Sequence, residues 1–149
     1  MPGLVIVLDY DGTVTEHDML DRVANHFGDP EVFRQMDEGL DRRTITLHDV
    51  LRREFEVVRA PLDEVVAWAI EQTTLRPGLH ELVALARERG WRLVVLSSGF
   101  HELIEPVLEA NGLGDVELVA NFVAARPDGW RASFRDEAVC AVCGEACKR

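Results

Sequence analysis

Two aspartates, Asp9 and Asp11, stand one residue apart directly after a hydrophobic run at residues 4–8. This spacing places both carboxyl groups on the same side of a strand end. A carboxylate can attack phosphorus and form an aspartyl phosphate if a metal ion cancels its repulsion from the phosphate oxygens. A second carboxyl can protonate the leaving oxygen, and Gly12 lets the chain turn while its amides stay near the anion. The pattern predicts phosphoryl transfer; a plain Asp-Gly turn is the alternative.

A second set of phosphate-binding candidates, Ser97, Ser98 and Gly99, follows another hydrophobic run at residues 93–96. A hydroxyl and successive backbone amides at the start of a helix can hold an anion without net positive charge. Ser is also a frequent helix N-cap, and taken alone this ordinary role would be preferred. Beside the paired aspartates, we interpret the three residues as a phosphate pocket.

The elements that must position these side chains follow an α/β pattern. Both hydrophobic runs are typical of strands in a parallel sheet with both faces covered. Residues 79–89, closed by Gly90, and residues 100–110 have helical periodicity on either side of the second strand. In such folds, ligands bind at the carboxyl ends of the strands. Residues 116–125 and 130–134 flank an Arg-Pro-Asp-Gly turn, which predicts a third strand continuing into a β-hairpin.

About sixty residues between the first strand and the helix at 79–89 show helical periodicity interrupted by Gly and Pro. Three or four short helices are too many for one crossover connection. We therefore expect an incomplete Rossmann-like core, formed by residues 1–14 and 76–149, with a helical cap inserted at residues 15–75.

Composition limits the classes of partner. The chain has 149 residues and a formal net charge of −11, which opposes binding to nucleic acid because that binding depends on Lys and Arg. A local site can still hold an anionic small molecule. No apolar run near the N-terminus is long enough to span a membrane, and no signal-peptide pattern is present. We expect a cytoplasmic protein without a membrane partner.

Asp-x-Asp-Gly-Thr after a hydrophobic strand resembles the first motif of the haloacid dehalogenase superfamily, and Ser97 stands where that family has its second motif. The resemblance implies that Asp9 is the nucleophile and a Mg²⁺ ligand. It implies that Asp11 is the acid/base and binds the metal through its carbonyl, and that Thr13 orients the phosphate loop. The third motif is a Lys that neutralises the aspartyl phosphate. Lys148 is the only Lys in the chain, although a solubilising terminal residue is the alternative.

Two family features have no counterpart in the sequence: the fourth motif, an acidic cluster near Gly-Asp-Gly, and two strands that would flank residues 4–8. We expect those residues to form an exposed sheet edge, which invites self-association. A truncated form of a longer enzyme is the simplest explanation; a pseudoenzyme or a missing partner segment is the alternative. We expect a Mg²⁺-dependent hydrolase of a small phosphorylated metabolite with weak or no turnover, or else a non-catalytic phosphate-binding or regulatory protein.

The cap, the Ser-x-Gly-Phe sequence and the hairpin resemble phosphoserine phosphatases and the methionine-salvage methylthiopentenyl phosphate phosphatases. In phosphoserine phosphatases an acidic cap residue holds the substrate ammonium, and Asp18 stands at that place. A cap Arg holds the substrate carboxylate. Arg52 and Arg53 are the nearby candidates, but the best register puts Glu54 at that position.

Cys140, Cys143 and Cys147 crowd the C-terminus, and their odd number argues against a disulfide framework. Thiolates at this spacing can share a tetrahedral zinc ion, which would need a fourth ligand from elsewhere. Free or packed thiols are the alternative.

Overall fold

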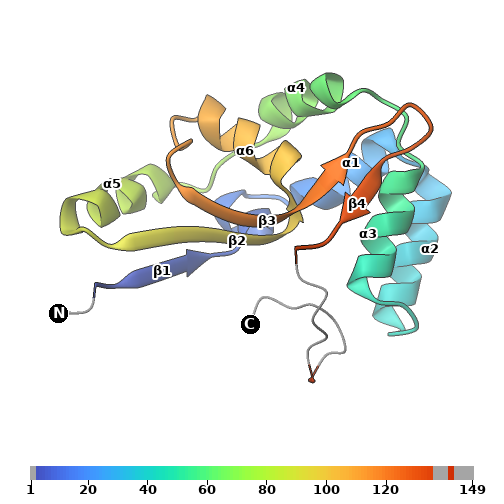
Figure 1. Ribbon diagram of the computed structural model, residues 1–149, viewed down its shortest axis with the longest axis horizontal. Helices are drawn as coiled ribbons and strands as arrows, with labels where there is room; N and C mark the ends of the chain where they lie inside the picture. The colour runs from blue at the N-terminus through green and yellow to red at the C-terminus, as the bar shows by residue number, and fades with distance from the viewer. Residues whose placement is uncertain (1–2, 136–140, 143–149) are drawn as a thin grey trace.

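The computed structural model describes residues 3–135 and 141–142 (Figure 1). Four strands form one sheet in the order β1-β2-β3-β4, in which the first three strands are parallel and the last is antiparallel. The strands are β1 (Val5–Leu8), β2 (Arg92–Phe100), β3 (Glu117–Ala124) and β4 (Arg131–Ser133). This arrangement confirms the predicted α/β fold with a parallel core and a terminal hairpin.

Four helices lie between β1 and α5, as the periodicity predicted, and α6 connects β2 to β3. The turn η1 (Tyr10–Val14) is followed by α1 (Met19–Phe27), α2 (Pro30–Asp41), α3 (Leu47–Glu56), α4 (Leu62–Gln72), α5 (Leu79–Arg89) and α6 (His101–Ala110). Helices α1, α2 and α3 begin at Asp18, Asp29 and Thr46, whose side chains accept hydrogen bonds from backbone amides in the first turn.

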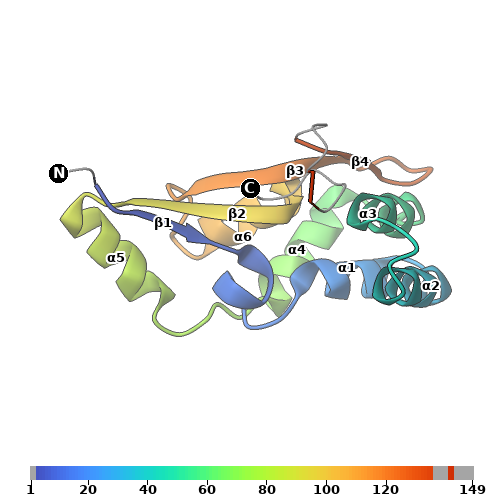
Figure 2. The same ribbon diagram turned by 90° about the horizontal axis from the view of Figure 1, so that it is seen from below.

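The sheet carries its helices on one face. Figure 2 shows α4, α5 and α6 on the same side of the strands. Side chains of β1 alternate accordingly: Val5 and Val7 are 51% and 56% exposed, whereas Leu8 packs against the hydrophobic cluster beneath the sheet. The prediction that both faces of β1 are covered is wrong for the described residues. Among the described strands, β1 pairs only with β2, so it takes the expected edge position. Figure 2 shows the described helices on the opposite face of the sheet from the one that β1 leaves exposed.

A continuous hydrophobic cluster joins the inserted helices to the strand ends. Val23, Phe55, Phe100 and Trp130, which come from α1, α3, the end of β2 and the hairpin, all belong to it. Trp130 is fully buried, and its indole N–H donates a hydrogen bond to the Ala60 carbonyl at 3.0 Å. The cluster therefore holds α3 beside the carboxyl ends of the strands. The division into core and cap at residues 15–75 stays a prediction.

The hairpin turn is pressed against α3. Gly129 has φ +125°, and a Cβ atom added there would lie 2.0 Å from the Glu56 carbonyl oxygen. Only glycine satisfies both conditions, because it lacks a Cβ and tolerates positive φ. Within the part of the chain that the structure describes, no helix is long and apolar enough to cross a membrane.

Candidate active site

The first motif forms a tight turn at the carboxyl end of β1. Gly12 has φ +73°, which reverses the chain, and its amide donates a hydrogen bond to the Thr15 hydroxyl at 3.2 Å. The guanidinium of Arg76 donates to the carbonyl oxygens of Gly12 and Thr13 at 2.8 and 3.1 Å. This turn is therefore fixed from two sides, and it presents Asp9 and Asp11 at the strand end.

The two aspartates have different environments. Asp9 is exposed, and its carboxylate accepts a hydrogen bond from the Tyr10 amide at 2.9 Å. Asp11 Oδ1 accepts hydrogen bonds from the amides of Met19 and Leu20 in the first turn of α1, at 2.9 and 3.1 Å. Burial raises the pKa of Asp11 to about 7, with a further contribution from the charges of nearby acids, against the effect of the two amides. Asp11 can therefore exchange a proton near neutral pH.

The second motif lies in an irregular end of β2. The parallel register with β3 shifts between Leu96 and Phe100, so the strand runs further than predicted and includes Ser97, Ser98 and Gly99, which precede α6. The hydroxyl oxygen of Ser97, which is buried, accepts a hydrogen bond from the Gly99 amide at 2.9 Å. Its own proton remains for an acceptor in the site.

Gly99 brings the two motifs together. A Cβ added at Gly99 would lie 3.2 Å from Ser97 Oγ and 3.7 Å from Asp11 Oδ2. The buried amide of Asn121, within β3 and opposite Phe100, donates to the Ser98 carbonyl at 2.9 Å and accepts from the Arg135 amide at 2.9 Å. The neighbouring strand therefore holds the second motif in place.

A cavity of about 210 Å³ opens between these motifs and helices α1, α2 and α3. Its lining residues are Asp9, Asp11, Asp18, Leu20, Asp21, Phe33, Asp37, Leu40, Leu47, Val50, Leu51, Glu54, Ser97, Ser98 and Gly99. Six of them carry carboxyl groups, and none of these described lining residues is Lys, Arg or His. The cavity is a pocket with hydroxyl and amide donors at the strand ends and acids toward the helices.

The model of the haloacid dehalogenase-like hydrolase family matches residues 6–148. The chain belongs to this family. One curated relative is the 2-hydroxy-3-keto-5-methylthiopentenyl-1-phosphate phosphatase of Brevibacillus brevis. It is 29% identical over 119 residues, which are 79% of this chain and 53% of that protein. Phosphoserine phosphatase of Halobacterium salinarum is 31% identical over 121 residues, which are 81% of this chain and 57% of that protein.

Solved structures agree with the fold of this haloacid dehalogenase-like chain. Phosphoserine phosphatase from T. onnurineus superposes with a TM-score of 0.65 and 26% identity, covering 92% of this chain and 67% of that one. A phosphoserine phosphatase determined as a phospho-aspartyl intermediate analogue gives a TM-score of 0.67 at 21% identity, covering 89% of this chain and 64% of that one. The chain spans about half the length of the curated relatives it matches.

The structure brings together part of the predicted site. The predicted residues that line the cavity are Asp9, Asp11, Asp18, Ser97, Ser98 and Gly99. Gly12 and Thr13 are exposed and lie outside the lining, where their carbonyls bind Arg76. Lys148 and the three cysteines lie outside the described residues.

Arg52 and Arg53 do not reach the cavity, because both lie on the exposed side of α3. The guanidinium of Arg52 pairs with Asp49 at 3.5 Å and lies 4.8 Å from the centre of the Phe134 ring. Their predicted contact with substrate has no support in this geometry. The buried side of α3 instead presents Glu54.

Five polar residues of the site were not predicted as site residues: the cavity acids Asp21, Asp37 and Glu54, and the supporting residues Arg76 and Asn121. Glu54 did carry a signal. It follows Val50 and Leu51 by four and three residues, so it falls on the apolar stripe of α3, where an acid is unusual.

Proposed function

We propose that this chain carries the phosphoryl-transfer site of a Mg²⁺-dependent phosphomonoester hydrolase that acts on a small phosphorylated metabolite. The supporting observation is that Asp9, Asp11 and Ser97, from two neighbouring strand ends, line one cavity. The phosphatase names of its relatives agree with this chemistry, and one neighbour of the same fold is a phospho-aspartyl intermediate analogue.

In this proposal, Asp9 supplies the nucleophile. An oxygen of its carboxylate attacks phosphorus in line, the bond from phosphorus to the ester oxygen breaks, and the leaving oxygen takes a proton from Asp11. Water then attacks the aspartyl phosphate and gives its proton to Asp11, which releases phosphate and restores Asp9. A pKa of about 7 suits Asp11 to both transfers. The Ser97 hydroxyl and the Ser98 amide hold the equatorial oxygens, while the Gly99 amide, which donates to Ser97 Oγ, orients that hydroxyl.

The donor set fits Mg²⁺, which prefers oxygen ligands and is usually held by one or two carboxylates together with water and substrate phosphate. We assign the Asp9 carboxylate and the Asp11 carbonyl to it. When bound, the ion neutralises negative charge on the phosphate oxygens. Lys148 is proposed to neutralise the aspartyl phosphate, and Gly12 and Thr13 to shape the phosphate loop.

Hydrolysis of p-nitrophenyl phosphate tests the proposal. We expect phosphate release that requires Mg²⁺, stops when the metal is chelated, and is lost in Asp9→Asn. The matched control is Asp41→Asn, which removes an exposed carboxylate at the end of α2, outside the cavity lining. Activity unchanged in Asp9→Asn would refute the mechanism.

A non-catalytic phosphate-binding protein is the second candidate. It is favoured by one observation: residues 3–135 and 141–142 contain no group of three or more His, Cys, Asp or Glu side chains placed to hold a metal. Isothermal titration with phosphate and Mg²⁺ separates the two, because binding without any turnover would favour this second function.

A further inference from the structure

Four acids form the helical side of the cavity: Asp18, Asp21, Asp37 and Glu54, here called the cap carboxylates. Asp18 caps α1 and Asp21 lies in its first turn, whereas Asp37 belongs to α2 and Glu54 to α3. Three helices therefore contribute acids to one cavity. The charges of the other three all act on Glu54, whereas Asp11 is affected by Asp18 and Asp9. Asp18 therefore connects the phosphate end of the cavity to a second, acidic end.

Glu54 is the feature that a solvated acidic surface does not explain. Its side chain lines the cavity, yet the residue is only 4% exposed. No hydrogen bond or ion pair within the described chain engages its carboxyl group. Burial and the three neighbouring acids raise its pKa to about 8. Its oxygens open into the cavity, since the described residues contain no buried side-chain oxygen that lacks a hydrogen-bond partner. A largely desolvated carboxyl group at this wall favours a ligand that supplies a donor and a positive charge.

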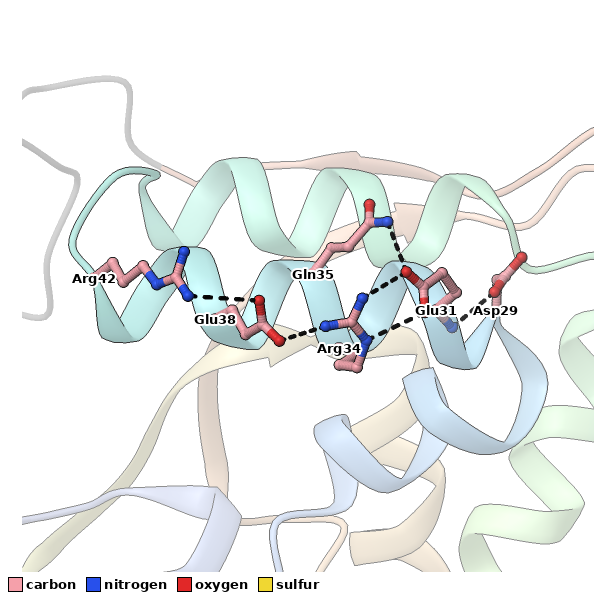
Figure 3. Close-up of polar contacts among 6 residues, drawn as sticks. All are labelled: Asp29, Glu31, Arg34, Gln35, Glu38 and Arg42. Carbon is pink, nitrogen blue, oxygen red and sulfur yellow. Dashed lines mark hydrogen bonds and ion pairs between the residues drawn. The ribbon is translucent and has the colours of Figure 1, made fainter.

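Three basic side chains on or next to α1 and α2 are directed elsewhere. On the outer side of α2, Arg34 bonds to Glu31 and Glu38, and Arg42 pairs with Glu38 (Figure 3). Arg22 of α1 donates to the backbone and side-chain oxygens of Gln72 at 3.4 and 3.2 Å. None of these groups is among the residues that line the cavity. Among the described residues, the cap carboxylates therefore lack an internal counter-charge.

Resting on the proposed function, we propose that the substrate is a phosphate ester that carries an ammonium group and no carboxylate. The ester phosphate binds at Ser97 and Ser98, and the ammonium binds among the cap carboxylates, with Glu54 as its main partner. Apolar lining residues such as Phe33 and Val50 accommodate the carbon chain between the two groups or alkyl substituents on the nitrogen.

A carboxylate next to the ammonium is disfavoured by the same geometry. It would enter a space bounded by four acids with no described cation among the lining residues, and like charges at close range repel. Phosphorylated amino acids should therefore bind less well than phosphorylated amines of the same size. Metal binding is a weaker explanation for the cap carboxylates, because the described residues include no metal-holding group of three such ligands.

Three esters of similar size separate these cases: 2-aminoethyl phosphate, its neutral analogue propyl phosphate, and O-phosphoserine. We expect 2-aminoethyl phosphate to bind at least about tenfold more tightly than either of the others, as measured by isothermal titration at pH 8, because a charged hydrogen bond is worth about that factor. Glu54→Gln should reduce the ratio between the amine and propyl phosphate to below about threefold. Glu56→Gln, which removes an exposed acid of the same helix, should leave the ratio unchanged.

The titrations are run without Mg²⁺, so that the heat measured reports binding and not turnover. A preference for the amine without hydrolysis of any ester would support this inference and refute the proposed function. Hydrolysis of p-nitrophenyl phosphate with equal affinity for the three esters would support the function and overturn this inference. Binding of Mg²⁺ alone that requires Glu54 would also overturn it. Asp37→Asn provides a second variant if Glu54→Gln does not fold, and it should also lower the ratio.

Discussion

Replacing Glu54 by Gln should make the stability of the protein less sensitive to alkaline pH. Burial, and then the charges of Asp21, Asp37 and Asp18, raise the pKa of Glu54 to about 8 from an ordinary value near 4.5. At a pH between these two pKa values, Glu54 keeps its proton in the folded protein and loses it in the unfolded chain. The stability contributed by the protonated group is therefore fully present below pH 4.5 and is lost as the pH rises through 8.

The size of the effect follows from the difference between the two pKa values of Glu54. A pKa that rises from 4.5 to about 8 on folding corresponds to at most about 5 kcal/mol of unfolding free energy. Because the carboxyl group opens onto a cavity that admits solvent, screening reduces the expected effect to about 1–2 kcal/mol. We therefore expect the free energy of unfolding of Glu54→Gln, relative to the wild type, to rise by about this amount between pH 5 and pH 9.

Urea denaturation followed by tryptophan fluorescence measures this difference, since three Trp residues report on folding. The wild type, Glu54→Gln and the exposed-site control Glu56→Gln are compared at several pH values, so that the titration of all other groups largely cancels. The control should run parallel to the wild type. If Glu54→Gln also runs parallel to the wild type across this range, Glu54 does not occupy the buried, acidic environment described above.

Three further predictions concern catalysis, packing and association. Hydrolysis of alkyl phosphate esters should decline above pH about 7, where Asp11 loses its proton, and Asp11→Asn should lower kcat by about 10²- to 10⁴-fold. Gly129→Ala should destabilise the fold by about 2 kcal/mol or more in thermal unfolding, because its Cβ would lie 2.0 Å from the Glu56 carbonyl. Val7→Lys, at the exposed edge strand, should reduce self-association measured by light scattering; an unchanged molar mass would exclude association through β1.

The phosphate end of the site could be predicted because its signals are local. Asp9 and Asp11, separated by one residue, follow an apolar run, and Ser97 follows the next such run, so the rule that ligands bind at strand ends sufficed to place them together. The hairpin was equally local, since Pro and Asp-Gly chemistry defines its turn. These inferences needed only the order of elements along the chain.

The acidic end could not be predicted in the same way, because it depends on how separate helices pack. Asp21, Asp37 and Glu54 belong to three helices, and periodicity alone does not say which faces meet. Arg52 is two residues from Glu54, yet a rotation of about 200° around the helix places it on the exposed side. The outer face of β1 was misjudged for a related reason: a continuous apolar run does not reveal whether a neighbour covers each face.

Covalent trapping at Asp9 tests the central claim most directly. The protein is mixed with a phosphate ester and Mg²⁺, quenched during turnover and treated with borohydride, which reduces an aspartyl phosphate to homoserine. Mass spectrometry of the N-terminal tryptic peptide, which ends at Arg22, then locates the change. We predict homoserine at position 9 in the wild type and none in Asp9→Asn. Phosphate release without modification of Asp9, or trapping at a different aspartate, would contradict the account.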